Sequence, residues 1–140
     1  MAVMTDFALH PRLAADSLAV ADLALCRVLL LNDSRFPWLI LVPRLASARE
    51  IIDLAPADRR LLAEEADKAA AALRDHSPTD KLNIGAIGNI VDQLHVHVVA
   101  RRRDDAAWPG VVWGHGVAIP YTPGAATERV SALKSALTGL

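Results

Sequence analysis

The residues best suited to chemistry lie close together near position 95. Every second residue there is apolar, and these residues are Leu94, Val96 and Val98. The residues that alternate with them and could do chemistry are Gln93, His95, His97 and Arg101. This period of two predicts a strand whose polar side chains share one face, about 6.5–7 Å apart. Two imidazoles and an amide would then project side by side from a rigid element, which gives a site positional precision.

Two adjacent imidazoles have three physical uses. The first is attack on phosphorus, in which a neutral imidazole nitrogen forms a covalent phosphohistidine-type intermediate that water later resolves. An ordinary histidine pKa near ~6.5 leaves the ring largely neutral in the cytoplasm, and the second imidazole would hold phosphate oxygens or protonate the leaving group. The second use is a metal site, to which His-x-His supplies two ligands. The third is structural, with both rings hydrogen-bonded to their neighbours.

Nearby residues favour the phosphorus chemistry over a metal site. Arg101 would lie on the same strand face as the histidines, and the loop that contains Gly88 and Asn89 lies just upstream. A metal would need further ligands, and the remaining candidates are poorly placed. They are His10 and His76 at segment ends, His115 between two glycines, and Cys26, the only cysteine. We therefore expect no bound metal.

The sequence patterns of the strands and helices that must position these residues predict an α+β fold with an antiparallel sheet. Five strands are expected, at residues 17–21, 26–31, 38–42, 81–87 and 94–100. Turn-forming residues between the second and third strands predict a hairpin.

The helices are predicted from proline positions and apolar spacing. A long helix is expected from Pro56 to about His76, because apolar residues recur there at helical spacing. These residues are Leu62, Ala66, Ala69 and Leu73. A short C-terminal helix is expected over residues 128–137. The segment 108–123 reads as an ordered loop in which Trp108 and Trp113 serve packing, with base stacking as the alternative.

Composition limits the class of protein. The chain has 140 residues, which is the size of one domain, so we expect a single domain over residues 1–140. A net charge of −1 argues against binding of long nucleic acids, which need an excess of basic residues. The longest apolar runs are far shorter than the ~20 residues that span a bilayer, and residues 1–6 lack the pattern of a signal peptide. We expect a soluble, cytoplasmic protein without a membrane partner.

The segment around the histidines also resembles a known family. Residues 93–99, Gln-Leu-His-Val-His-Val-Val, resemble the signature of the histidine triad (HIT) superfamily, His-φ-His-φ-His-φ-φ with φ apolar, and Gln93 stands at the first histidine. Residues 36–44 are similar to the family strand that ends in Pro and a basic residue, and Asn83 matches a frequent Asn. The resemblance covers roughly residues 15–105, followed by a C-terminal loop and helix over 106–140. Within the superfamily the chain is most similar to bacterial HIT-family hydrolases that resemble dinucleoside-polyphosphate (Ap4A) hydrolases.

This resemblance implies a HIT-like fold, with a five-stranded antiparallel sheet, one long helix and a short C-terminal helix. It implies a nucleotide hydrolase or nucleotidyl transferase that acts at an α-phosphate through a nucleotidyl-histidine intermediate, without a cofactor. Substrates would be dinucleoside polyphosphates or nucleoside phosphoramidates, and the protein would be a homodimer with sheets joined edge to edge.

The resemblance also assigns roles to single residues. His95 aligns with the nucleophile, and His97 aligns with the histidine that contacts the phosphate and assists the leaving group. Gln93 would orient the neighbouring imidazole. The residues expected to bind nucleotide or phosphate are Asn32, Asp33, Asn83, Asn89 and Arg101.

Two positions depart from the family pattern. Gln93 cannot act as an acid or base, and Trp38 stands where some members carry another histidine. Two alternatives therefore stand beside the enzyme. One is a nucleotide-binding module with little or no catalysis, and the other is a metalloenzyme built on His95 and His97.

Overall fold

Five antiparallel strands form one sheet in the order β1-β2-β3-β5-β4 in the computed structural model, which describes residues 6–139. The strands are β1 (Ser17–Asp22), β2 (Cys26–Leu31), β3 (Trp38–Pro43), β4 (Lys81–Gly85) and β5 (Val96–Arg101). The predicted α+β class and the five-stranded antiparallel sheet are confirmed. The expectation about a signal peptide concerns residues 1–6, of which 1–5 lie outside the described residues.

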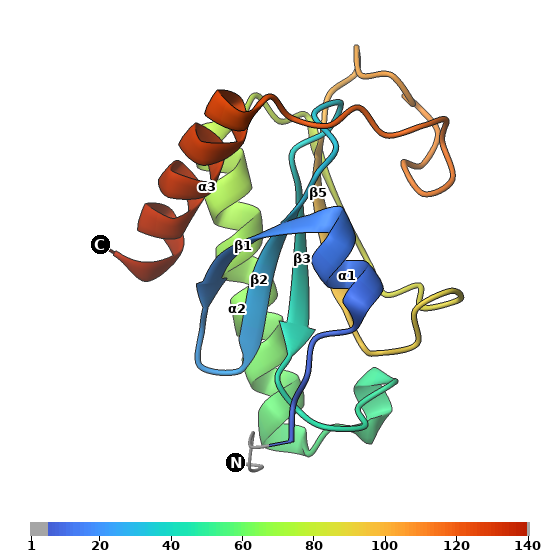
Figure 1. The fold of residues 1–140 in the computed structure, drawn as a ribbon, viewed down its shortest axis with the longest axis vertical. Coiled ribbons are helices and arrows are strands. Elements are labelled where there is room, and N and C mark those ends of the chain that lie inside the picture. Colours follow the sequence, from blue (N-terminus) through green and yellow to red (C-terminus); the bar gives the residue numbers. More distant parts are fainter. Residues whose placement is uncertain (1–5, 140) are drawn as a thin grey trace.

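In the described residues, three α-helices accompany the sheet: α1 (Pro11–Asp16), α2 (Pro56–His76) and α3 (Pro123–Thr138). A short 3₁₀ helix (Ile51–Asp53) precedes α2. Helices α2 and α3 pack side by side on one face of the sheet, and α1 lies on the other face (Figure 1). Across residues 6–139, none of the helices is both long and apolar enough to cross a membrane.

The helix boundaries differ from prediction at two places. Helix α3 begins at Pro123 rather than at residue 128, because the Thr122 hydroxyl accepts a hydrogen bond from the Ala125 N–H and Pro123 suits the first helical position. Helix α1 was not predicted, since six residues are too few to show an apolar period. Its first turn is capped by the ring Nδ1 of His10, which accepts from the N–H of Arg12.

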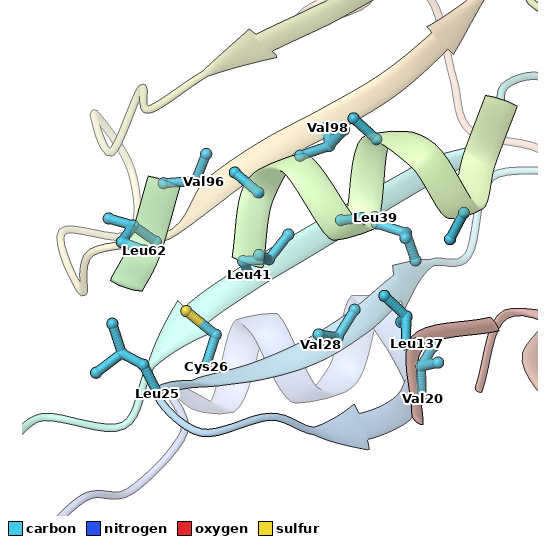
Figure 2. Close-up of a cluster of buried hydrophobic side chains, with 14 of the residues drawn as sticks. Val20, Leu25, Cys26, Val28, Leu39, Leu41, Leu62, Val96, Val98 and Leu137 are labelled. Carbon is cyan, nitrogen blue, oxygen red and sulfur yellow. The ribbon is translucent and has the colours of Figure 1, made fainter. Parts of the chain in front are cut away.

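Apolar side chains fill both sides of the sheet. Those of β2, β3 and β5 that point toward α2 form the larger core, and Figure 2 shows Leu39, Leu41, Val96 and Val98 gathered against this helix. A second cluster covers the opposite face and includes Leu13 of α1. Strands β3 and β5 are therefore buried along their whole length. The face that carries the histidines is consequently enclosed by protein.

Strand β5 begins at Val96, two residues later than predicted, and β4 ends at Gly85, two residues earlier. The N–H of Leu94 donates to the carbonyl of Ala48 instead of joining the ladder. Residues 86–95 thus form a connection, in which Gly88 has a φ of 70° that favours glycine. As a result, Gln93 and His95 lie in the segment that leads into β5, and only His97 lies on the strand.

A buried carboxylate ties α2 to the beginning of β2. The two side-chain oxygens of Glu65 accept hydrogen bonds from the N–H groups of Leu25 and Cys26, at 2.9 and 2.8 Å. All three residues are buried. Glu65 therefore satisfies two backbone donors that would otherwise have no partner inside the core.

We expect Glu65→Gln to lower the free energy of unfolding by about 2 kcal/mol, because one buried N–H would then face an amide NH₂ instead of an acceptor. Urea unfolding followed by circular dichroism measures this change. Glu64→Gln is the matched control, since the neighbouring Glu64 is exposed and should change stability by less than about 0.5 kcal/mol. Equal stabilities of the two variants would contradict the role assigned to Glu65.

Candidate active site

The imidazole of His95 is held by a backbone carbonyl. Its Nδ1 lies 2.7 Å from the carbonyl oxygen of Gln93, and the residue is 7% exposed. Because a carbonyl can only accept, the proton of the neutral ring resides on Nδ1 and the lone pair on Nε2. His95 therefore presents a free Nε2, as a nucleophile requires.

Nδ1 of His97 accepts a hydrogen bond, whereas Nδ1 of His95 donates one. The donor to His97 is the indole Nε1–H of Trp38, at 2.9 Å. Burial, and to a lesser extent the neighbouring His95, lowers the pKa of His97 to about 4. The centroids of the two imidazoles are 4.8 Å apart, so the predicted pairing of these side chains is confirmed.

Aromatic rings frame His97 on two sides. The Trp38 ring lies 5.7 Å from the imidazole centroid and the Trp113 ring 5.6 Å, both edge to face. Trp113 also lies against Gly85 of β4, where a Cβ would come within 3.4 Å of the indole. Trp113 therefore packs the loop against the site, as expected, whereas Trp108 stacks on Arg101 elsewhere.

Both histidines line a cavity of about 400 Å³ that also includes the expected residue Asn89. Its walls are mostly apolar, and they include Leu13, Ile40, Ile87, Ile90 and Trp113. Among the residues that the structure describes, Arg12 and Asp16 of α1 are the only charged ones in this lining, and they pair with each other at 3.7 Å. Within residues 6–139, the cavity next to the histidines thus carries no unpaired basic side chain.

Asn32 and Asp33 line an adjoining cavity of about 450 Å³, which shares Leu31 and Trp38 with the first. Their oxygens are already engaged. Asn32 accepts from the N–H of Tyr121, and Asp33 pairs with Arg35 at 2.8 Å. These two residues therefore lie near the histidines and also anchor the C-terminal loop.

Arg101 and Asn83 are brought together, but away from the histidine cavity. The Arg101 guanidinium is 2% exposed and donates to Asp105, to Asn83 Oδ1 and to the carbonyl of Gly110. Hydrogen bonds from Arg101 lower the pKa of Asp105 to about 2. Although Arg101 shares the strand face of His97, it lies four residues, or about 13 Å, further along. We therefore reassign Arg101 and Asn83 from the phosphate site to the loop that carries Trp113.

The side chain of Gln93 has another use than the one expected. Its Oε1 accepts from the N–H of His10, and its Nε2 donates to the carbonyl of Ala8, both at 2.8 Å. The backbone carbonyl of Gln93, and not its amide, orients His95. Gln93 thus fastens the segment that leads into α1, and α1 forms part of the cavity wall.

Several residues of the site were missed by sequence reasoning. Helix α1 contributes Arg12, Leu13 and Asp16, and no apolar period revealed it. Trp38 was noted only as a departure from the family pattern. Among residues 6–139, no group of three or more His, Cys, Asp or Glu side chains is arranged to hold a metal ion. His10 caps α1, and the ring of His76 bonds the carbonyl of Ala72.

A five-stranded antiparallel sheet accompanied by helices matches the fold of histidine triad proteins. A HIT domain matches residues 12–104, and the chain therefore belongs to the HIT family. Proteins of this family are generally nucleotide-binding proteins or hydrolases. No protein with a curated description matches the chain.

Solved structures of bacterial histidine triad proteins are similar over nearly the whole chain. One from Sinorhizobium meliloti 1021 is 45% identical, with a TM-score of 0.91 over 94% of this chain and 97% of that one. One from Bradyrhizobium japonicum is 43% identical, with a TM-score of 0.91 over 94% and 98%. One from Marinobacter aquaeolei VT8 is 40% identical, with a TM-score of 0.92 over 96% and 98%.

We expect Arg101→Met to lower the free energy of unfolding by about 3–5 kcal/mol at pH 7, because it leaves the Asp105 carboxylate buried without its partner. Arg102→Met is the control, since Arg102 pairs with Asp104 on the surface and should cost less than about 1 kcal/mol. Urea unfolding measures both changes.

The same pair predicts a pH dependence. Because the pKa of Asp105 falls from 3.8 to about 2 on folding, its contribution is complete above about pH 4 and is lost as the pH falls through 2. The stability difference between wild type and Arg101→Met should shrink over that interval. A difference that stays constant from pH 7 to pH 2 would contradict this assignment.

Proposed function

We propose that this chain is a nucleotide hydrolase or nucleotidyl transferase that acts at an α-phosphate through a covalent intermediate on His95. The observation that carries the proposal is the hydrogen bond from Nδ1 to the Gln93 carbonyl, which leaves the Nε2 lone pair of a cavity-lining histidine free. Nε2 attacks phosphorus and forms a P–N bond. The bond between phosphorus and the leaving group breaks, and the leaving group keeps the electron pair of that bond. Water, or another acceptor in a transferase, then attacks phosphorus and releases His95.

The cavity supports a nucleotide as the bound group. Its apolar walls suit the faces of a base and a sugar, and the imidazole of His97 and the amide of Asn89 supply neutral polar groups. The adjoining cavity with Asn32 and Asp33 extends the space available to the nucleoside. In this proposal the phosphate rests against His95 and His97.

Charge around the site bears on the leaving group. Beyond His95 lies a further cavity of about 370 Å³, lined by three carboxylates and one arginine, namely Glu50, Asp53, Asp92 and Arg49. Arg49 is paired with Asp92. A polyphosphate leaving group carries several negative charges and would be repelled by this excess of carboxylates. We therefore favour a leaving group of low charge, as in nucleoside phosphoramidates, over a dinucleoside polyphosphate.

A nucleotide-binding module with little catalysis is the second candidate. It is favoured by Gln93, whose side chain is occupied by Ala8 and His10 and has no acid or base to offer. Such a module would use the same cavity. Turnover, and not binding, separates the two functions.

We expect His95→Ala to lower turnover of adenosine 5′-phosphoramidate by on the order of 10³-fold or more, because it removes the nucleophile. Wild type should turn over this substrate faster than a diadenosine polyphosphate, and mass spectrometry should detect a nucleotidyl adduct on its His95. His76→Ala is the control, since His76 lies at the end of α2, outside the three cavities around the histidines. Undiminished turnover in His95→Ala would refute the mechanism. Calorimetric binding by a wild type that turns over neither substrate would establish the binding module.

We also infer a homodimer formed through β4, the edge strand beside β5. Ile84 on this edge is 51% exposed, and Ile87 and Ile90 follow it on the surface. An exposed edge strand with apolar side chains pairs readily with a second chain. Sedimentation equilibrium should give twice the chain mass, and Ile84→Lys should shift the protein toward monomer. A monomeric wild type at micromolar concentration would exclude this assembly.

A further inference from the structure

A buried hydrogen bond joins the indole of Trp38 to the imidazole of His97, at 2.9 Å. Trp38 is 5% exposed and His97 is 8% exposed, so water does not compete for it. An indole nitrogen can donate but cannot accept. Nδ1 of His97 must therefore carry the lone pair, and the proton of the neutral ring must reside on Nε2.

The strand ladder sets this contact. In the pairing of β3 with β5, Ile40 lies opposite His97 and Trp38 opposite Val99. Trp38 is thus the diagonal neighbour of His97 on the same face, within reach of a large aromatic side chain. Trp113 and His95 enclose the imidazole further, with centroids 5.6 and 4.8 Å away. The ring is therefore held in the orientation that gives Nδ1 to Trp38.

We propose that Trp38 is a positioning residue that holds His97 as a neutral Nε2–H donor, so that His97 steadies the phosphoryl oxygens and supplies no proton to the leaving group. The tautomer of His97 is a property of the free protein. The role of His97 toward the phosphoryl oxygens and the leaving group rests on the proposed function. His95 and His97 would then act as complementary partners, one with a lone pair on Nε2 and the other with a proton there.

Protonation of His97 is opposed by this arrangement. An imidazolium has an N–H at both nitrogens, so its Nδ1–H would point at the N–H of Trp38. The ring is also buried beside His95, and the pKa of His97 is accordingly lowered to about 4. From the described part of the chain, the cavity offers only the paired Arg12 and Asp16 as charged groups, and β3 and β4 present Ile40 and Gly85 to the ring. Within residues 6–139, no carboxylate hydrogen-bonds either nitrogen of His97.

The tautomer determines what His97 can do with its ring proton. At neutral pH His97 holds a single ring proton, and donating it fully would leave an imidazolate. Its Nε2–H can therefore hydrogen-bond a non-bridging phosphoryl oxygen as negative charge develops there. The leaving group departs with the electron pair of the broken bond and takes any proton it needs from solvent water.

Nitrogen-15 NMR of histidine-labelled protein tests the tautomer directly. In wild type, Nδ1 of His97 should show the shift of an unprotonated nitrogen and Nε2 that of an N–H, unchanged from pH 8 to pH 5.5. In Trp38→Phe the ring should populate both tautomers, because Nδ1 loses its donor. Its titration midpoint should rise, because the hydrogen bond that stabilises the neutral ring is lost, while burial and the neighbouring His95 still keep the pKa low.

Trp113→Phe is the matched control. It removes the same atoms from a ring that stands 5.6 Å from His97 in a similar edge-to-face arrangement, but Trp113 donates no hydrogen bond to the imidazole. This variant should leave the tautomer of His97 unchanged. An Nδ1–H tautomer in wild type, or equal effects of the two substitutions, would overturn the proposal. The wild-type spectrum decides the tautomer even if Trp38→Phe does not fold.

A series of substrates with different leaving groups tests whether His97 donates a proton to the leaving group. With aryl esters of adenosine 5′-monophosphate, the rate of formation of the adduct in wild type should fall steeply as the pKa of the leaving phenol rises, equally at pH 6 and pH 8. A shallow dependence at pH 6 that becomes steep at pH 8 would show that His97 donates a proton, and would overturn the role assigned to His97 toward the leaving group. Failure of the proposed function is distinguishable, because no ester would react while the spectra would still show the Nε2–H tautomer.

Discussion

In the ladder between β3 and β5, Ile40 lies opposite His97 and Trp38 opposite Val99, and the candidate site depends on this register. Both strands are buried on both faces, so a slip by one residue would exchange core and site side chains. The same register places an indole donor beside the imidazole of His97. Packing of the core thus selects the arrangement of the polar groups, although the larger apolar cluster lies on the opposite face of the sheet.

Two polar anchors complete the walls of the cavity. The amide of Gln93 bonds Ala8 and His10 and so fastens the segment before α1. The ion pair of Arg101 with Asp105 fastens the loop that brings Trp113 to His97. Both anchors are buried or half-buried and hydrogen-bonded, as polar groups inside a protein must be. Several polar residues of the motif region therefore build the site without lining it.

The electrostatic character of the site follows from these anchors. Basic side chains near the histidines are paired, Arg12 with Asp16 and Arg35 with Asp33. The indole of Trp38 donates to His97 and holds it as a neutral ring, and His95 donates its Nδ1–H to the carbonyl of Gln93. A phosphate would thus be bound by neutral donors in a largely apolar cavity, where each hydrogen bond is stronger than in water. This favours a substrate of low charge.

The sequence alone determined what depends on neighbours along the chain. Alternation of side chains is a property of an extended backbone, so the spacing of His95 and His97 placed both imidazoles on one side. Helical spacing likewise located α2 at Pro56–His76. Tertiary structure decided the partners of these side chains. Trp38 and His97 are 59 positions apart in the sequence, and Gln93 and His10 are 83 apart. Strand register and the paths of the loops bring each pair into hydrogen-bond contact. Arg101 lies on the same strand face as His97 but does not line the cavity, because its guanidinium donates to the carbonyl of Gly110 in the loop that covers it.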